Sequence, residues 1–415
     1  MNHAARSLTA PRECDPGREK AQKEPMAKPL RLTSVKVLGY RPFRDFVARF
    51  GRLEVLVGAN GSGKSSLFEF LKFLRDSVYQ DIPPEIVAGS VGQQIFHVPG
   101  PERFWWSIEV DFSQPNLVYY QGEVMGPVGR THVALERVQT TYRGHTKPYL
   151  FMNIREREGV LQDPESKKFK KQEIVLKRPN QLALSTVTNP AMATLYDLRE
   201  YIRNWRFYSS FNIDNGKIRK SVPIEQEPIL HEDAGNLSSV LHYLMTEHST
   251  IFYDLQEVLR AAVPGFKNLT VLARGGPGEV IAFWQEVGID RALSLADLSD
   301  GILRLICWCV LCLQPNSPTL ICIDEPDQGV HPRTLPILAG LFKKASERTQ
   351  VLLATHASYF LMQFDLSQIA VLRKENGEAK FIKPSSSAVL TENLQEFGPA
   401  ELEAMHRSDE LERLA

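Results

Sequence analysis

One octapeptide restricts the possible folds of this chain more than any other feature of its sequence. Residues 58–65 fit the pattern G-x-x-x-x-G-K-[ST] and lie between a β-branched apolar stretch, 52–58, and a run, 64–78, whose apolar residues recur on one helical face. The glycines allow backbone N–H groups to turn inward around phosphate oxygens, and a helix start adds positive potential. Lys64 would reach the β- and γ-phosphates of a nucleotide, and the Ser65 hydroxyl would bind Mg²⁺. The sequence therefore predicts a strand, a phosphate-binding loop and a helix in succession.

Two carboxylates follow a second apolar stretch. Residues 320–324, LICID, are typical of a buried strand and bring Asp324 and Glu325 to its carboxyl end, where ligands bind in open α/β sheets. Asp324 suits coordination of Mg²⁺ through water, and Glu325 is the natural general base for an attacking water. The alternative is a buried strand that merely ends in acidic residues before a turn. The phosphate loop in the same chain favours the catalytic interpretation.

Two more segments could contact phosphate. Leu298-Ser299-Asp300-Gly301 opens an apolar run, 302–313, that is typical of a helix. A serine hydroxyl and a glycine N–H at a helix start can form an anion site, although alone they are an ordinary helix cap. His356 follows an apolar strand and precedes a turn of small residues, so it can face the γ-phosphate. A lone histidine is more often a packed or exposed residue.

Apolar periodicity divides the chain into three kinds of region. Alternation with a period of two between residues 104 and 155 predicts an antiparallel meander. Helical spacing returns at 193–205 and 236–266, where Pro264-Gly265 is a stop signal. After Gly301, helices and strands alternate, which predicts a parallel sheet covered by helices. The predicted fold class is therefore α/β: a mostly parallel sheet flanked by helices, with an antiparallel β-subdomain and a small helical lid.

Taken in order, these segments resemble the heads of ATP-binding-cassette (ABC) ATPases. Residues 58–65 are similar to the Walker A motif, 298–301 to the signature, 320–325 to Walker B, 327–331 to the D-loop and His356 to the switch histidine. The stretches GANGSGKSS, GYRPFRDF, LSDG and EPDQGVHP narrow the resemblance to the RecF-like and SMC-like branch. The resemblance spans about residues 30–384 and implies a P-loop NTPase fold of the ABC-ATPase type.

The resemblance also implies an ATPase that uses ATP and Mg²⁺ and releases ADP and phosphate. The residues that it implies in nucleotide binding are Gly58, Ala59, Asn60, Gly61, Ser62, Gly63, Lys64, Ser65, Ser66, Ser299 and Gly301. It implies Ser65 and Asp324 as metal ligands, and Glu325, Lys64 and His356 as catalytic residues. Two copies would enclose ATP head-to-tail, with Ser299 and Gly301 of one copy capping the γ-phosphate held by the other. We expect this homodimer to depend on ATP and to separate after hydrolysis.

Several positions depart from the transporter-type pattern. Asp300 and Ile302 replace its signature Gly and Gln, and His331 stands where the D-loop carries Asp. These differences disfavour a transporter subunit. Instead of a long coiled coil, strands and short helices are predicted between the phosphate loop and the signature, so a compact head is expected. Three residues compete for the glutamine that senses Mg²⁺ in such ATPases: Gln93, Gln94 and Gln121.

The expected organisation has three parts. Residues 1–29 mix charges and prolines without an apolar period and are predicted to be a flexible leader. Residues 30–384 form the ATPase head, whose core covers about 30–100 and 290–384, with the β-meander and helical lid inserted at about 101–289. Residues 385–415 are predicted to be a linker and a short helix.

Composition and apolar runs indicate the cellular compartment of the protein. The 415 residues include 49 Lys plus Arg and 49 Asp plus Glu, a balance that neither indicates nor excludes a nucleic-acid partner. The longest apolar run, 302–313, is too short for a membrane span, and the N-terminus carries no apolar segment of a secretory signal. Five cysteines, three of them close together in a predicted helix, do not resemble a disulfide framework. We expect a cytoplasmic protein with no membrane partner.

The biological partner stays open. A basic cluster could bind a DNA backbone or could be a solvated loop: Lys167, Lys168, Lys170, Lys171, Lys177 and Arg178. A weaker group of the same kind is formed by Lys217, Arg219 and Lys220. Arg41 could reach the nucleotide or could be an ordinary surface residue. Three roles follow: an ATPase acting on DNA in repair or genome maintenance, an ATPase sensor of an anti-phage defence or toxin system with a nuclease in trans, or a transporter motor. The three helical cysteines are expected to be buried hydrophobes rather than zinc ligands.

Overall fold

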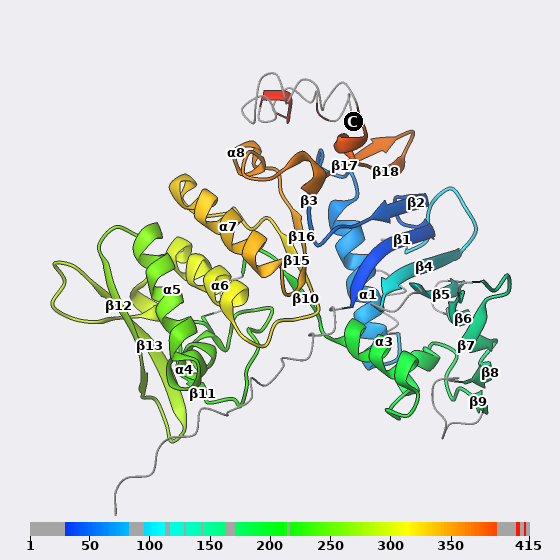
Figure 1. The fold of residues 1–415 in the computed structure, drawn as a ribbon, viewed down its shortest axis with the longest axis horizontal. Coiled ribbons are helices and arrows are strands. Elements are labelled where there is room, and N and C mark those ends of the chain that lie inside the picture. Colours follow the sequence, from blue (N-terminus) through cyan, green and yellow to red (C-terminus); the bar gives the residue numbers. More distant parts are fainter. Residues whose placement is uncertain are drawn as a thin grey trace, which may run out of the picture.

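A central parallel sheet organises the chain and positions its loops (Figure 1). The computed structural model describes residues 30–82, 95–112, 117–127, 130–142, 144–162, 171–211, 213, 216–387, 404–406 and 411. The predicted leader and most of the predicted C-terminal segment lie outside these residues, and the proposed domain boundaries remain predictions. Within the described ranges, no helix is long and apolar enough to cross a membrane.

The central sheet has six strands in the order β10-β15-β16-β3-β17-β18. They are β3 (Leu53–Val57), β10 (Trp205–Tyr208), β15 (Leu320–Asp324), β16 (Gln350–Ala354), β17 (Ile369–Glu375) and β18 (Glu378–Ile382). Neighbouring strands are parallel except for the pair of β17 and β18. Because parallel strands end at one edge, the segments that follow β3, β15 and β16 lie along the same edge. The predicted mostly parallel sheet is confirmed.

Eight antiparallel strands form a second sheet, in the order β2-β1-β4-β5-β6-β7-β8-β9. They are β1 (Arg31–Tyr40), β2 (Phe43–Arg49), β4 (Arg103–Asp111), β5 (Leu117–Met125), β6 (His132–Thr140), β7 (Tyr149–Arg155), β8 (Glu158–Leu161) and β9 (Gln172–Val175). The predicted meander is thus confirmed. It is extended by β1 and β2 at one side and by β8 and β9 at the other.

Helix α1 (Lys64–Tyr79) packs on the buried face of this second sheet. Its apolar residues fall every three or four positions, so one side of the helix is buried. Phe73 and Trp106 of β4 meet edge to face, with ring centroids 6.0 Å apart. A short η1 turn (Ala183–Thr186) and α3 (Ala193–Arg203) contact the same helix. The two helices predicted in this half are confirmed to within two residues.

The other half of the chain is mainly helical (Figure 1). Its helices are α4 (Leu237–Glu247), α5 (Ser249–Ala262), α6 (Asp300–Leu313), α7 (Leu335–Ala345) and α8 (Ser358–Leu361). A small sheet is formed by β11 (Val222–Pro223), β12 (Phe266–Ala273), β13 (Glu279–Glu286) and β14 (Leu293–Ser294). Short 3-10 turns occur at η3 (Leu295–Asp297), η4 (Pro332–Thr334), η5 (Leu366–Gln368) and η6 (Pro384–Ser386). The helical spacing predicted over 236–266 corresponds to two helices, α4 and α5, because His248 leaves the helical conformation with φ −130° and ψ 51°.

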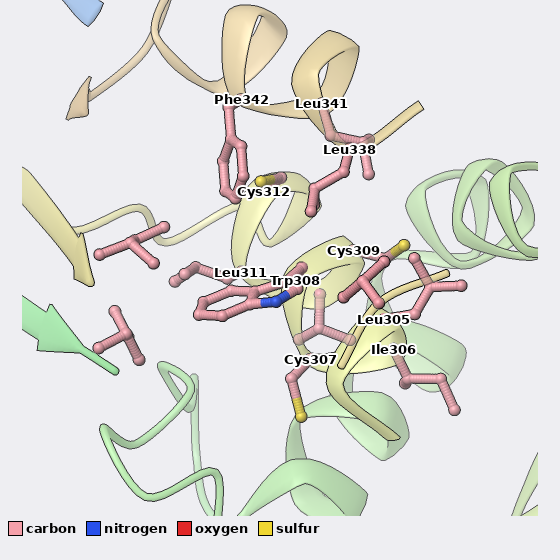
Figure 2. Packing of buried hydrophobic residues seen from close by; sticks show 14 of the residues in the cluster. Leu305, Ile306, Cys307, Trp308, Cys309, Leu311, Cys312, Leu338, Leu341 and Phe342 are labelled. Atoms are coloured by element: carbon pink, nitrogen blue, oxygen red, sulfur yellow. The ribbon is translucent and has the colours of Figure 1, made fainter. Parts of the chain in front are cut away.

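Helix α6 packs against α5 and α7, and Figure 2 shows its buried side chains. Trp308 is fully buried, and its ring centroid lies 4.3 Å from that of Phe211 and 6.2 Å from that of Phe342. The sulfur atoms of Cys307, Cys309 and Cys312 point to different sides of the helix (Figure 2). These cysteines are buried hydrophobes, and burial raises the pKa of each thiol. No group of three or more potential metal ligands occurs among the described residues.

The central sheet separates two hydrophobic cores. In β3, Val55 and Val57 belong to the core of the helical half, whereas Leu56 belongs to the core shared with α1 and the antiparallel sheet. Strand β16 alternates in the same way, with Leu353 on one side and Leu352 on the other. The strands that carry the loops at the carboxyl edge are therefore buried on both faces.

Candidate functional site

The phosphate loop, Gly58–Ser65, leaves the carboxyl end of β3 and enters α1. Gly58 has a φ of 143°, and a Cβ atom there would lie 1.9 Å from the Leu372 carbonyl oxygen in β17. A residue with a side chain therefore does not fit at this position. Gly61 and Gly63 also have positive φ, 78° and 110°, which turn the loop back towards the helix. The glycines that the motif requires therefore allow backbone conformations in the loop that other residues seldom adopt.

Polar donors converge within this loop. The buried Lys64 ammonium donates to the carbonyl oxygens of Gly58, at 2.6 Å, and Ala59, at 3.2 Å. The Ser62 hydroxyl oxygen is buried without a hydrogen-bond partner in the part of the chain that the structure describes. Gly63 gives α1 no side-chain cap, so the first N–H groups of the helix are not capped from there. These features fit a bound phosphate group. Of the other predicted loop residues, Ala59, Asn60, Gly61 and Ser65 are exposed and Ser66 is half-buried.

Asp324 lies beside the phosphate loop. The Ser65 hydroxyl donates to its Oδ2 atom across 3.3 Å, although the two residues are 259 positions apart. Burial raises the pKa of Asp324, and the Ser65 hydrogen bond and the Lys64 charge oppose that change. A hydroxyl and a carboxylate at one point are oxygen ligands of the kind that Mg²⁺ takes. The two predicted metal ligands are therefore neighbours.

Glu325 follows directly with an unusual backbone conformation. Its φ is 53°, in the left-handed region that residues other than glycine seldom adopt. Its N–H donates to the Ala354 carbonyl at the end of β16, at 2.8 Å, and its carbonyl accepts from Gln328 at 3.1 Å. These bonds hold the turn at the carboxyl edge. Strained residues of this kind cluster at functional sites.

The segment after β16 is tied to the segment after β15. The Thr355 hydroxyl donates to the Asp327 carboxylate at 2.5 Å, and the Thr355 N–H donates to the Leu56 carbonyl of β3 at 3.1 Å. The adjacent His356 is exposed but partly desolvated. This desolvation, followed by the Lys64 charge, lowers its pKa, whereas Glu325 opposes the change. The lowered pKa favours the neutral imidazole, which retains one N–H donor.

The predicted signature turn, Leu298–Gly301, leads into helix α6. Ser299 is exposed and is the N-cap, its hydroxyl accepting from the Ile302 N–H at 3.5 Å. A cavity of about 750 Å³ opens beside it, lined by Ser299, Gly301, His331 and other residues, but by none of the phosphate loop. The structure thus brings Lys64, Ser65, Asp324, Glu325 and His356 to one edge, whereas the cavity beside Ser299 and Gly301 includes no phosphate-loop residue.

The structure also locates some of the remaining candidates. Gln121 lies within β5, where its amide donates to Ser107 at 3.4 Å, and the competing Gln93 and Gln94 lie outside the described residues. Strand β10, which the sequence reasoning missed, is the neighbour of β15 and ends at Tyr208. Arg41 pairs with Glu69 of α1.

The basic cluster is only partly described. Lys171 and Lys177 are exposed, and Arg178 forms an ion pair with Asp81. Lys167, Lys168 and Lys170 lie outside the described residues. In the weaker group, Arg219 contacts the signature turn.

Comparisons with known proteins agree with this geometry. Residues 54–110 and 164–362 match the model of a family described as "AAA domain, putative AbiEii toxin, Type IV TA system". A solved Smc head bound to the C-terminal winged-helix domain of ScpA is 14% identical, with a TM-score of 0.52, and 85% of this chain and 97% of that chain are covered. A Pyrococcus furiosus Smc head with an extended coiled coil, bound to the C-terminal domain of ScpA, is 11% identical, with a TM-score of 0.53 and coverages of 88% and 100%. No curated protein matches the chain. The family match spans more than half of the sequence, so the chain belongs to this AAA-domain family and has the fold of an SMC-like, ABC-type ATPase head.

Proposed function

We propose that this site binds ATP with Mg²⁺ and hydrolyses it, and that the bound nucleotide decides whether two copies of the chain are joined. The observation that carries the proposal is the 3.3 Å contact between Ser65 Oγ and Asp324 Oδ2. It joins the end of the phosphate loop to the strand that delivers both carboxylates, as a nucleotide-bound metal requires.

Each residue has a role that its surroundings support. Lys64 and the loop N–H groups hold the β- and γ-phosphates, while Ser65 and Asp324 bind Mg²⁺, which neutralises phosphate charge. Glu325 orients a water molecule and accepts its proton as attack begins. His356 is partly desolvated and neutral, and it donates a hydrogen bond to the γ-phosphate. Catalysis then rests on positioning and charge stabilisation.

The second part of the proposal is a head-to-tail dimer. Ser299 is exposed at the amino end of α6, a helix of 14 residues, and lines a cavity that includes none of the phosphate-loop residues. A helix start of this kind accepts an anion, and the exposed one here is available to the γ-phosphate held by another copy. Two equivalent contacts related by a twofold axis would close such a dimer.

Two substitutions separate binding from hydrolysis. Glu325→Gln should keep ATP binding, slow turnover by about 100-fold or more, and accumulate an ATP-dependent dimer, because the amide cannot accept the proton. Lys64→Ala should lose nucleotide binding and dimerisation together. Lys72→Ala, an exposed lysine on the same helix, is the matched control and should behave like the parent. ATP binding, phosphate release and sedimentation velocity give the three readouts. Normal turnover by Glu325→Gln would remove Glu325 from the role of base.

For the biological role, we infer an ATPase subunit of a toxin or anti-phage defence system whose effector, a nuclease, is a separate protein. The description of the matched family supports this choice over DNA repair. A protein partner in trans is also consistent with the Smc heads, which were solved with a domain of ScpA. The alternative is a direct action on DNA through basic residues such as Lys171 and Lys177. If DNA stimulates the ATPase or the dimer at moderate salt, and high salt abolishes the effect, the DNA role is favoured.

A further inference from the structure

Arg219, from a distant part of the chain, forms hydrogen bonds to the signature turn and to the residues before it. Arg219 donates through Nη1 to the carbonyl oxygens of Leu295 (3.2 Å), Ala296 (3.0 Å) and Leu298 (2.9 Å). Its Nη2 donates to the Asp300 carboxylate at 2.6 Å. Because Nη1 carries only two N–H groups, the three carbonyl oxygens share them, while the planar guanidinium keeps Nη2 directed at the carboxylate. The turn that presents Ser299 is therefore held on both sides of that residue.

The segment that carries Arg219 is itself anchored. Ile218 is only 3% exposed and belongs to the core of the helical half. Lys217 pairs with Asp233 at 3.0 Å, and the Arg219 N–H donates to the Gly216 carbonyl at 3.3 Å. The Arg219 side chain is 23% exposed, so solvent competes only partly for its donors. The guanidinium is thus fixed relative to the core.

This contact accounts for the aspartate that departs from the usual signature. Asp300 is the first residue of α6, and its side chain is 48% exposed beside Ser299. A carboxylate at this position is stabilised by the helix dipole, but it repels an incoming phosphate. The Arg219 charge cancels that repulsion. A glycine at this position would need no such partner.

We propose that Arg219 is a positioning residue for binding between copies: it orders residues 295–298 and neutralises Asp300, so that Ser299 and Gly301 can receive the γ-phosphate held by a second copy. The inference rests on the proposed head-to-tail dimer and adds a residue that the motif does not contain. In this proposal, the Arg219–Asp300 ion pair determines the net charge that the signature turn presents.

The test uses the full chain in the Glu325→Gln background with ATP and Mg²⁺. Arg219→Ala should weaken dimerisation at least tenfold, because charge-assisted hydrogen bonds are lost at both nucleotide sites. ATP binding by the monomer should be unchanged. Arg219→Ala with Asp300→Asn should recover much of the loss, since the repelling carboxylate is gone. The matched control, Lys220→Ala, removes an exposed lysine next to Arg219 and should dimerise like the parent.

The outcomes are distinguishable. If the parent does not dimerise with ATP, both the proposed function and this inference fail. If the parent dimerises and Arg219→Ala dimerises equally well, only the role of Arg219 fails. A double variant no tighter than Arg219→Ala also overturns the inference, since a purely structural contact would not be repaired by removing Asp300. If thermal unfolding shows that Arg219→Ala does not fold, Arg219→Lys replaces it. Lysine keeps the charge and loses most of the bonds, so we expect about a threefold weakening, and no weakening overturns the proposal.

Discussion

Two helical glycines should respond to alanine with opposite signs. Gly301 is the second residue of α6, and Gly340 lies in the middle of α7. A Cβ atom on Gly340 would meet no heavy atom within 4 Å, so Gly340→Ala should gain roughly 0.5–1 kcal/mol of helix propensity. A Cβ atom on Gly301 would lie 2.6 Å from the Gly329 carbonyl oxygen, well inside ordinary contact.

The cost at Gly301 follows from what surrounds Gly329. To restore a contact of 3.4 Å, the two backbones must separate by roughly 0.8 Å, the difference between the two distances. Gly329 has a φ of 72°, and the Arg304 guanidinium fills the space where its side chain would be. Arg304 is itself bound to the Ser210 carbonyl at 2.9 Å. Overpacking of this kind costs about 1–3 kcal/mol, more than the gain in helix propensity.

Calorimetric unfolding of the parent and the two variants measures the difference. For a chain of 415 residues, 1 kcal/mol corresponds to about 1 °C in the midpoint, because the unfolding entropy scales with length. Gly340→Ala should raise the midpoint by about 1 °C, and Gly301→Ala should lower it by about 1–2 °C. A midpoint for Gly301→Ala at or above that of the parent would refute the steric reasoning. Gly340→Ala controls for the general effect of a helical alanine.

Two further predictions concern buried titratable groups. Burial raises the pKa of Glu136 from 4.5 to about 7, against hydrogen bonds from Tyr120 and two backbone N–H groups. The folded chain then holds a proton that the unfolded chain has released, so stability should fall as pH rises from about 4.5 to 7. Urea midpoints at pH 5.5 and 8 should show a smaller change in Glu136→Gln than in the parent, and an equal change would contradict the assignment. Burial also raises the pKa of the Cys309 thiol to about 12 and that of Cys307, Cys312 and Cys322 well above the ordinary range. At pH 8 a thiol reagent should therefore modify at most one of the five cysteines before unfolding, and two or more fast equivalents would refute the burial.

The phosphate loop and the carboxylates after β15 were predictable because each of these motifs is a short, contiguous stretch of sequence. A glycine pattern dictates the backbone path of the phosphate loop, and Asp324 and Glu325 follow a short, Ile-rich apolar run of the kind that is typical of a buried strand. Strand order then brings separate loops to one edge by a general rule of parallel sheets. Helix α1, β15 and α6 consequently form within two residues of the expected positions.

The elements that were missed depend on distant partners. Strand β10 has only four residues and directly follows α3, so the helical period runs into it; its pairing with β15 links Trp205 to Leu320. The break between α4 and α5 at His248 carries no proline or glycine signal. Arg219 could not be connected with the signature turn from spacing, since 81 positions separate it from Asp300. The one available signal was the departure of Asp300 from the usual glycine.

The two-sided burial of the central strands has a consequence for redesign. The odd-numbered apolar residues of β3 and β16 belong to one interior and the even-numbered apolar residues to the other, so each interior can be repacked through its own positions along a common strand. The β3 backbone is shared by both interiors, and it continues into the phosphate loop. A change of volume on either side is therefore transmitted to the same few peptide units at the end of β3.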